Sequence, residues 1–219
     1  METGIMRHPV RWLGLAAAAL ILAGCNTVYY SAMEKIGKEK RHLLVDNVEE
    51  VKESQTKAQE EFTDALTRIK ELYAFDGGDL EKFYNRFKDS YEDCDDRARQ
   101  IEKRINDVKE VAKDLFVEWE AEIKEINDAG LKSRSRASLK DARVKYARLE
   151  KVMSASTKKM YPVLAKLKDY VLYLKHNLNA KAVGTLSGEV VSIEKDVAGL
   201  IDDMTASIKE AQAFINSFN

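Results

Sequence analysis

Cys25 and Cys94 carry the two thiols of the sequence, and in its thiolate form cysteine is a strong nucleophile. Cys25 follows Leu22-Ala23-Gly24, whose small residues let a peptidase approach the backbone. These four residues resemble a lipoprotein processing motif, and the resemblance implies acylation of the Cys25 thiol with a diacylglycerol and cleavage of the bond before it. Once Cys25 is acylated, Cys94 has no partner for an intramolecular disulfide. We expect Cys94 to be buried and unreactive, the alternatives being a reactive thiol or a disulfide between chains.

The residues before Cys25 have the pattern of a secretory signal. Arg7 and Arg11 give a basic start, and an apolar run extends from Trp12 to Leu22. About eleven apolar residues are too few for a bilayer, which takes about 20 in a helix. A basic start, a short apolar run and small residues before a cleavage point are typical of a signal peptide. Because the last four residues also resemble the bacterial lipobox, we predict a lipoprotein signal peptide over 1–24 and a single lipid-anchored domain over 25–219.

Asn26 bears on the membrane to which the chain is sorted. An aspartate after the acylated cysteine would signal retention in the inner membrane, and this chain has asparagine there. We therefore expect an anchor of three acyl chains in the bacterial outer membrane, on its periplasmic face, with the inner membrane as the alternative. Two or more acyl chains hold a protein stably to a membrane.

Other side chains that could do chemistry are few and scattered. Only His42 and His176 follow the signal, and they fall on different predicted helices. No CxxC, HExxH, GxSxG or phosphate-loop pattern occurs. Asp93, Asp95 and Asp96 stand beside arginines, as on a solvated helix face. We therefore expect no catalytic residue, no metal site and no cofactor, and predict that the protein is not an enzyme.

The elements that must position these residues are helices. The sequence has 10 Gly and 2 Pro, and 33% of its residues are charged. Breaks fall at 74–79, where Asp79 can cap the next helix, at 127–130, where Gly130 would end a helix, and more softly within 177–188. These breaks predict four helices, at about 28–74, 79–127, 132–177 and 181–217.

Apolar residues recur at alternating spacings of four and three along each predicted helix. In the second helix the series runs from Leu80 to Ile126, with Glu122 as its polar exception. A 3.5-residue repeat of this length keeps one seam facing a partner and indicates a left-handed coiled coil. The last two helices have wider stripes, which include Leu164 and Leu178 and indicate more than one neighbour. We predict an all-α fold, an elongated antiparallel coiled coil or four-helix bundle of four long helices.

Charge is unevenly distributed, although it sums to −1. Residues 131–180 carry a net charge of +10, against −6 for 79–130 and −3 for each of 30–78 and 181–219. One interpretation is that the basic helix selects acidic neighbours within the bundle. The other is a face for anionic partners such as lipid headgroups, lipopolysaccharide phosphates or cell-wall polymers, and the two can coexist. The candidate face consists of Lys132, Arg134, Arg136, Lys140, Arg143, Lys145, Arg148 and Lys151.

Several short stretches carry a resemblance to a known family. They are residues 29–37 (YYSAMEKIG), 45–50 (VDNVEE), 64–66 (DAL) and the turn at 73–83. Over the whole mature chain, the sequence resembles a family of uncharacterised Gram-negative lipoproteins known only as a domain of unknown function. The resemblance implies a bacterial envelope location and a helical, coiled-coil character. It implies no activity and no catalytic residue.

These features predict a non-enzymatic cell-envelope lipoprotein that acts as a membrane-anchored helical scaffold or adaptor. Its expected partners are the membrane, through the acyl chains, and an envelope protein or a second copy of the chain, with no nucleic acid. The alternative is a periplasmic binder or sensor of a lipid or another anionic or apolar envelope ligand. It is suggested by the aromatic residues Tyr84, Phe87, Tyr91 and Trp119 on one stripe, although aromatic residues at heptad spacing more often form a core.

Overall fold

The computed structural model describes residues 40–71 and 79–218. The chain divides into two compact units, Met1–Leu43 and Leu44–Asn219. Of the first unit only residues 40–43 are described, so the account that follows concerns the second. The predicted signal peptide over 1–24, the acylation site Cys25 and the predicted helical residues 28–39 lie outside the described residues.

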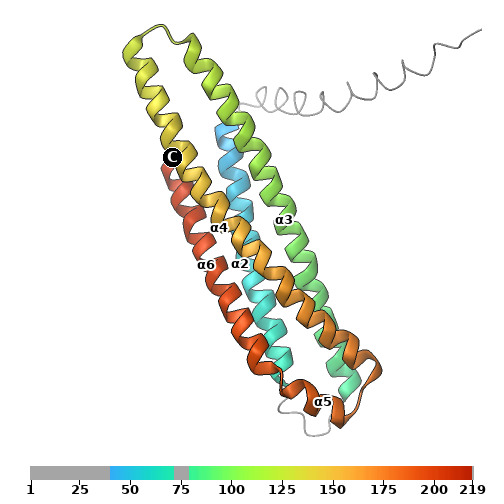
Figure 1. Ribbon diagram of the computed structural model, residues 1–219. Helices are drawn as coiled ribbons and strands as arrows, with labels where there is room; N and C mark the ends of the chain where they lie inside the picture. The colour runs from blue at the N-terminus through green and yellow to red at the C-terminus, as the bar shows by residue number, and fades with distance from the viewer. Residues whose placement is uncertain (1–39, 72–78, 219) are drawn as a thin grey trace, which may run out of the picture. The chain divides into compact units, whose positions relative to one another are not determined.

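Helices account for nearly all of the described residues, which contain no strand, and the predicted all-α class is confirmed. They are α2 (Lys40–Glu71), α3 (Leu80–Glu125), α4 (Ala129–His176), α5 (Ala180–Ser187) and α6 (Val190–Phe218) (Figure 1). At about 1.5 Å per residue, α3 and α4 are each about 70 Å long. None of the helices in this part of the chain combines the length and apolar character needed to cross a membrane.

Polar side chains fix where three of the helices begin. The carboxylate of Asp79 accepts the backbone N–H of Lys82 at 3.0 Å, and that of Asp128 accepts the N–H of Leu131 at 2.7 Å. Asn179 caps α5 in the same way. Each cap satisfies a backbone N–H group that the first turn of a helix leaves unpaired. The predicted capping role of Asp79 is therefore confirmed.

Two predicted boundaries are wrong. Gly130 does not end the second helix, because α3 stops at Glu125 and Asp128 starts α4, which places Gly130 in the first turn of α4. The last predicted helix, 181–217, is two helices, because α5 ends at its C-cap Gly188 and α6 begins at Val190. Glycine costs a helix interior about 1 kcal/mol relative to alanine, so a break there is favourable.

Ion pairs show that α4 packs antiparallel to both α3 and α6 (Figure 1). Lys109 of α3 lies 3.9 Å from Glu150 of α4, whereas Glu120, later in α3, lies 2.7 Å from Arg143, earlier in α4. The same crossing order relates α4 to α6, through the pairs Arg148–Glu210, Lys159–Asp203 and Lys166–Asp196.

Side chains of α2 contact all three of these helices. Glu61 pairs with Arg97 of α3 at 2.7 Å, and Lys52 donates to Gln212 of α6 at 2.8 Å. Contacts further along follow an antiparallel order with both helices, in the pairs Glu50–Arg104 and Lys70–Glu194. Gln55 reaches Ser156 of α4 through the core. Within the unit Leu44–Asn219, α2 therefore runs antiparallel to α3 and α6.

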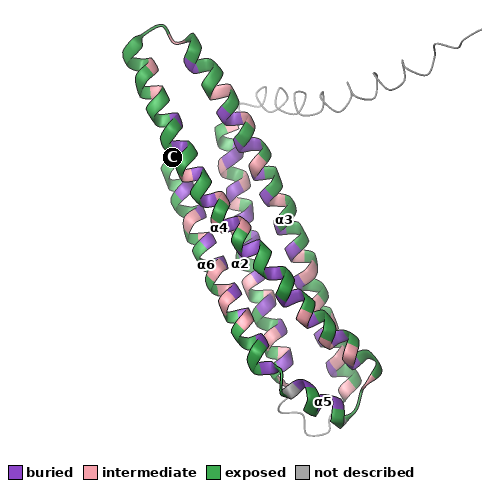
Figure 2. Ribbon diagram, in the orientation of Figure 1, coloured by how far each residue is buried: buried purple, intermediate pink, exposed green. Residues whose placement is uncertain are grey.

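One apolar stripe of each long helix forms the core (Figure 2). Large side chains that are completely or almost completely buried include Leu44, Phe62, Ile69, Phe87, Ile101, Leu149, Met153, Met160, Leu167, Leu174 and Ile193. The predicted stripe is wrong at Glu122, which is exposed because the stripe steps by four from Trp119 to the buried Ile123. Leu178 is also exposed, because it follows the end of α4 at His176.

Candidate functional site

The eight basic residues of the candidate face all lie in the first half of α4. Two of them form ion pairs with neighbouring helices, Arg143 with Glu120 of α3 at 2.7 Å and Arg148 with Glu210 of α6 at 2.9 Å. Two others are held locally, through the ion pair Lys145–Asp141 and the bond from Lys132 Nζ to the Lys124 carbonyl. Helix pairing therefore accounts for part of the basic face.

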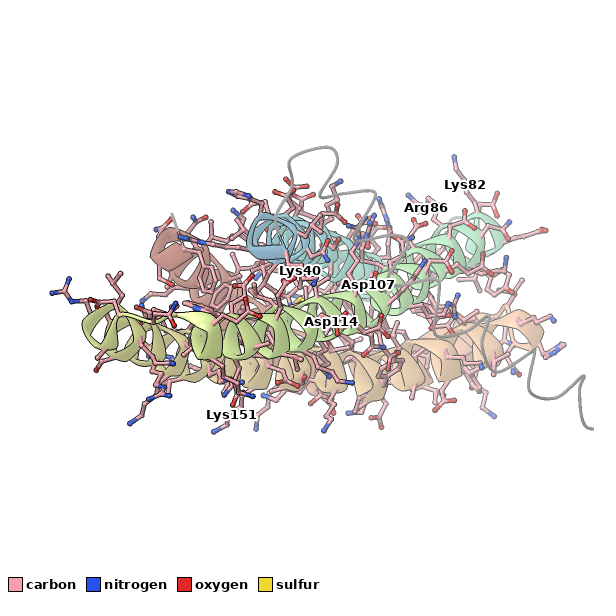
Figure 3. The ribbon with its side chains drawn as sticks, turned by 90° about the horizontal axis from the view of Figure 1, so that it is seen from above. Lys40, Lys82, Arg86, Asp107, Asp114 and Lys151 are labelled. Atoms are coloured by element: carbon pink, nitrogen blue, oxygen red, sulfur yellow. The ribbon has the colours of Figure 1, made fainter. Side chains whose placement is uncertain are left out.

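The remaining four basic residues, Arg134, Arg136, Lys140 and Lys151, are exposed. Within the described part of the chain the structure shows no hydrogen bond or ion pair for any of their side chains. Figure 3 shows Lys151 extending from α4 away from the other helices. Helix pairing does not account for these four cations.

The helices α3 and α4 continue past the end of α6. An aromatic cluster marks this level, because the Tyr146 ring packs against Phe116 with 5.6 Å between centroids and against Phe214 of α6 with 6.3 Å. Phe214 is followed by Phe218, the last residue of α6, at 4.6 Å. Residues 116–146, which we call the hairpin end, therefore consist of α3, its turn and α4 (Figure 1).

The hairpin end contains an open groove between α3 and α4 with a volume of about 490 Å³. Its apolar lining consists of Ile123 from α3 and Leu139, Val144 and Ala147 from α4. Ile123 and Leu139 are buried at its base, whereas Val144 is 63% exposed. We call this feature the hairpin groove.

The polar lining of the hairpin groove is mostly basic. It consists of Lys124, Arg136, Lys140 and Arg143, with Glu120 as its one acid. Arg143 neutralises that acid, and its hydrogen bond to Glu120 lowers the pKa of the carboxyl. The Arg143 guanidinium also lies 5.8 Å from the centre of the Phe116 ring, a cation–π contact that helps to fix it in place. Lys124 also interacts electrostatically with Glu120, whereas Arg136 and Lys140 have no acidic counterpart in the groove.

Sequence patterns locate only part of this groove. Arg136 and Lys140 belong to the predicted basic face, and their spacing of four places them on one side of a helix. Lys124 and Ile123 were not predicted, because the expected apolar stripe of α3 passed through Glu122 instead of Ile123. Val144 follows Arg143 in the sequence and is exposed. It is an apolar residue outside the apolar stripe of its helix, and this position is the signal that could have identified it as part of the groove.

The four aromatic residues considered for a ligand site are not brought together. Phe87 is fully buried and stacks on Phe83, with 6.1 Å between the ring centroids. Tyr84 and Tyr91 are half-buried at the opposite end of α3 from Trp119. Trp119 belongs to the hairpin end, where its indole N–H donates to Ser135 Oγ at 3.0 Å. Of the four, only Phe87 belongs to the core, and the other three lie half-buried along α3.

Neither thiol chemistry nor a metal cluster marks the described residues. Cys94 is fully buried, and burial raises the pKa of its thiol above the usual range. The predicted burial of Cys94 is confirmed. Among residues 40–71 and 79–218 there is no group of three or more His, Cys, Asp or Glu side chains that could hold a metal ion.

Comparison with known proteins places the chain in a family without an assigned activity. Residues 29–218 match the family described as protein of unknown function (DUF2959). No curated protein and no solved structure matches the chain. Because the family match covers most of the sequence, the chain belongs to the protein family of unknown function DUF2959.

Proposed function

We propose that the protein is a non-enzymatic, lipid-anchored helical scaffold or adaptor of the bacterial cell envelope. The observation that carries this proposal is the division of charge on α4. Three of its cations pair with acids of α6, as in Arg148–Glu210 and Lys166–Asp196, whereas Arg136, Lys140 and Lys151 have no acidic partner in the described residues. An exposed, unbalanced basic surface on a helical frame suits contact with a partner rather than catalysis.

The frame that we propose is an antiparallel four-helix bundle of α2, α3, α4 and α6 with coiled-coil packing. Its support is the antiparallel order of contacts between neighbouring helices and the contact of Gln55 with Ser156 between α2 and α4. Long helices joined by short turns give a stiff frame. A stiff frame can hold a surface at a set distance from an anchor.

The anchor that we propose is Cys25, acylated after removal of residues 1–24. The support is the sequence Leu22-Ala23-Gly24-Cys25 after a basic start and a short apolar run. Asn26 favours the periplasmic face of the outer membrane. Replacing Cys25 by Ala is expected to leave the chain unprocessed or to remove it from the outer-membrane fraction. Unchanged fractionation together with unchanged lipid labelling would contradict the anchor.

The scaffold role is tested by photo-crosslinking in cells. A photoreactive residue placed at Ala155, which is exposed on α4, is expected to give a discrete adduct with an envelope protein or with a second copy of the chain. The matched control is the same residue at Ala206, which is exposed on α6. The proposal fails if position 155 gives no protein adduct, or if both positions give the same adducts.

A second candidate function is the binding of an anionic or apolar envelope ligand. The hairpin groove favours it, because an apolar base lies there together with four basic side chains and a single acidic one. In this reading the groove faces a ligand while the rest of the bundle acts as its support.

A further inference from the structure

The hairpin groove contains basic side chains that outnumber the acidic ones available to pair with them. Arg136 and Lys140 lie one helical turn apart on α4, a spacing at which like charges repel. Lys124 approaches from α3, and the one acid of the groove, Glu120, is occupied by Arg143 at 2.7 Å. A basic cluster that no acid balances is complementary to an anion.

The apolar lining restricts the kind of anion. Ile123 and Leu139 form a buried base, and Val144 exposes 63% of its surface beside the cations. Leu131 and Val117 of the same hairpin end are 57% and 63% exposed. A free phosphate ion would leave these apolar side chains in water, whereas the interface of a bilayer offers both phosphate groups and apolar surface.

The direction of the helices places the hairpin groove toward the same end of the unit as Leu44. Because α2 runs antiparallel to α3, Leu44 lies toward the same end as the turn between α3 and α4. Residues 26–39, which join Cys25 to the start of α2 at Lys40, span at most about 50 Å when fully extended and about 21 Å if helical. The end of α3 lies about 32 Å along the helix axis from Arg104, the partner of Glu50. The hairpin end is thus within reach of a membrane that holds Cys25.

We propose that the hairpin groove binds the phosphate headgroups of an anionic phospholipid bilayer. Arg136 and Lys140 contact the phosphates, Val144 contacts the apolar region just below them, and Arg143 holds the edge of the groove in place. The proposal rests on the membrane anchoring proposed above and extends it to a second contact. An acidic protein segment would satisfy the cations but would leave the exposed Val117, Leu131 and Val144 unexplained.

Trp119 is a native probe of this contact, because it lies in the hairpin end next to Glu120. The acylated protein purified from cells, which lacks Trp12 once residues 1–24 are removed, is reconstituted into vesicles with a trace of dansyl-headgroup lipid. Trp12→Phe leaves Trp119 as the single tryptophan in any chain that keeps those residues. Energy transfer from Trp119 to the dansyl group is expected to be stronger in vesicles that contain phosphatidylglycerol than in pure phosphatidylcholine. It should fall when salt shortens the Debye length to about 3 Å.

The decisive variant is Arg136→Gln with Lys140→Gln. Each basic residue at an anionic surface contributes about 1 kcal/mol, or about fivefold in binding, so the docked population ratio should fall about thirtyfold. The matched control is Lys57→Gln with Lys209→Gln, which neutralises two exposed lysines on α2 and α6 and should change nothing.

Three outcomes would overturn the proposal. The first is equal energy transfer in neutral and anionic vesicles. The second is an equal loss of energy transfer in the control variant. The third is no energy transfer in anionic vesicles, as expected if an acidic protein or another segment of the chain covers the groove. Flotation of the same samples reports separately whether the chain is tethered to the vesicles, and acylation of Cys25 is read from lipid labelling in cells. Failure of the groove contact is therefore distinguishable from failure of the anchor.

Discussion

Gln55 of α2 and Ser156 of α4 meet across the core, where Gln55 Nε2 donates a hydrogen bond to Ser156 Oγ at 2.8 Å and both residues are fully buried. Ser156 in turn donates to the Met153 carbonyl at 2.9 Å. Gln55 Oε1 and the buried Ser207 Oγ of α6 have no hydrogen-bond partner among the described residues. Polar groups at core positions cost stability, but they restrict which helices can face one another and in which register.

This pair gives the first prediction. Gln55→Leu is expected to raise the free energy of unfolding by about 1 kcal/mol, because it removes a buried carbonyl oxygen that lacks a partner. Ser156 keeps its bond to Met153 in this variant. Gln55→Ala removes the same amide but leaves a cavity, so it should lower the free energy of unfolding by about 2 kcal/mol. Urea unfolding of the unmodified protein and the two variants measures both changes. A marked loss of stability in Gln55→Leu would contradict the prediction that the unpartnered oxygen of Gln55 destabilises the core.

The second prediction concerns Arg97, whose guanidinium binds Glu61 of α2 through Nε at 3.0 Å and through Nη2 at 2.7 Å. Both side chains are only 23% exposed. Arg97→Lys keeps the charge but loses the two-pronged contact, so it should lower the free energy of unfolding by about 1 kcal/mol. Arg99→Lys is the control, because Arg99 is 59% exposed and contacts aspartates of its own helix. Exposed ion pairs of this kind contribute at most about 1 kcal/mol to stability and often nothing measurable. Equal losses of unfolding free energy in Arg97→Lys and Arg99→Lys would contradict the prediction.

The third prediction follows from Tyr161 of α4, whose hydroxyl donates to the Glu102 carboxylate of α3. This bond, helped by partial burial, raises the pKa of Tyr161 to about 12. The folded state therefore holds this proton more tightly than the unfolded state, where a tyrosine has a pKa of about 10. The protonated Tyr161 hydroxyl therefore stabilises the folded state fully below a pH of about 10. This stabilisation is lost as the pH rises toward the pKa of Tyr161 in the folded state.

Ring NMR signals of labelled tyrosine test this pKa directly. The signal that disappears in Tyr161→Phe identifies the residue, and in the unmodified protein it should titrate near the raised pKa. Glu102→Gln removes the carboxylate, so the Tyr161 pKa should move back toward its usual value. A Tyr161 signal that titrates like a free tyrosine in the unmodified protein would show that the bond to Glu102 does not form in solution.

The fourth prediction concerns Cys94, which is fully buried on α3 and whose thiol pKa is raised by that burial. In a Cys25→Ala chain, Cys94 is the one remaining thiol and should resist alkylation until the protein unfolds. Its rate of modification should therefore rise in parallel with unfolding by urea. Rapid labelling in the absence of urea would mean that the thiol is accessible and that the core opens at α3.

Much of the fold could be predicted from periodicity, because the spacing of four and three extends over long helices and turn residues separate them. The stripe fails at Glu122, where a single step of four replaces the expected three and carries the seam from Trp119 to Ile123. Capping also competes with the glycine rule, since Asp128 starts α4 before Gly130 can end α3. Such local choices depend on one hydrogen bond, which a composition pattern does not contain.

The candidate site was predictable in charge but not in shape. The excess of lysine and arginine on α4 identified Arg136 and Lys140, but it did not separate them from Arg143 and Arg148, which are held by ion pairs. That distinction depends on which acid of a neighbouring helix lies opposite, and therefore on the relative axial position of two helices. The groove likewise depends on which side chains of α3 lie opposite those of α4 after the turn.

The anchoring of the chain to a membrane through Cys25, as proposed above, can be tested by mass spectrometry of the protein purified from the membranes of its own cells. We expect an N-terminal peptide that begins at Cys25, lacks residues 1–24 and carries the added mass of three acyl chains. An N-terminal peptide that still contains residues 1–24, or one that begins at Cys25 without added lipid, would contradict it.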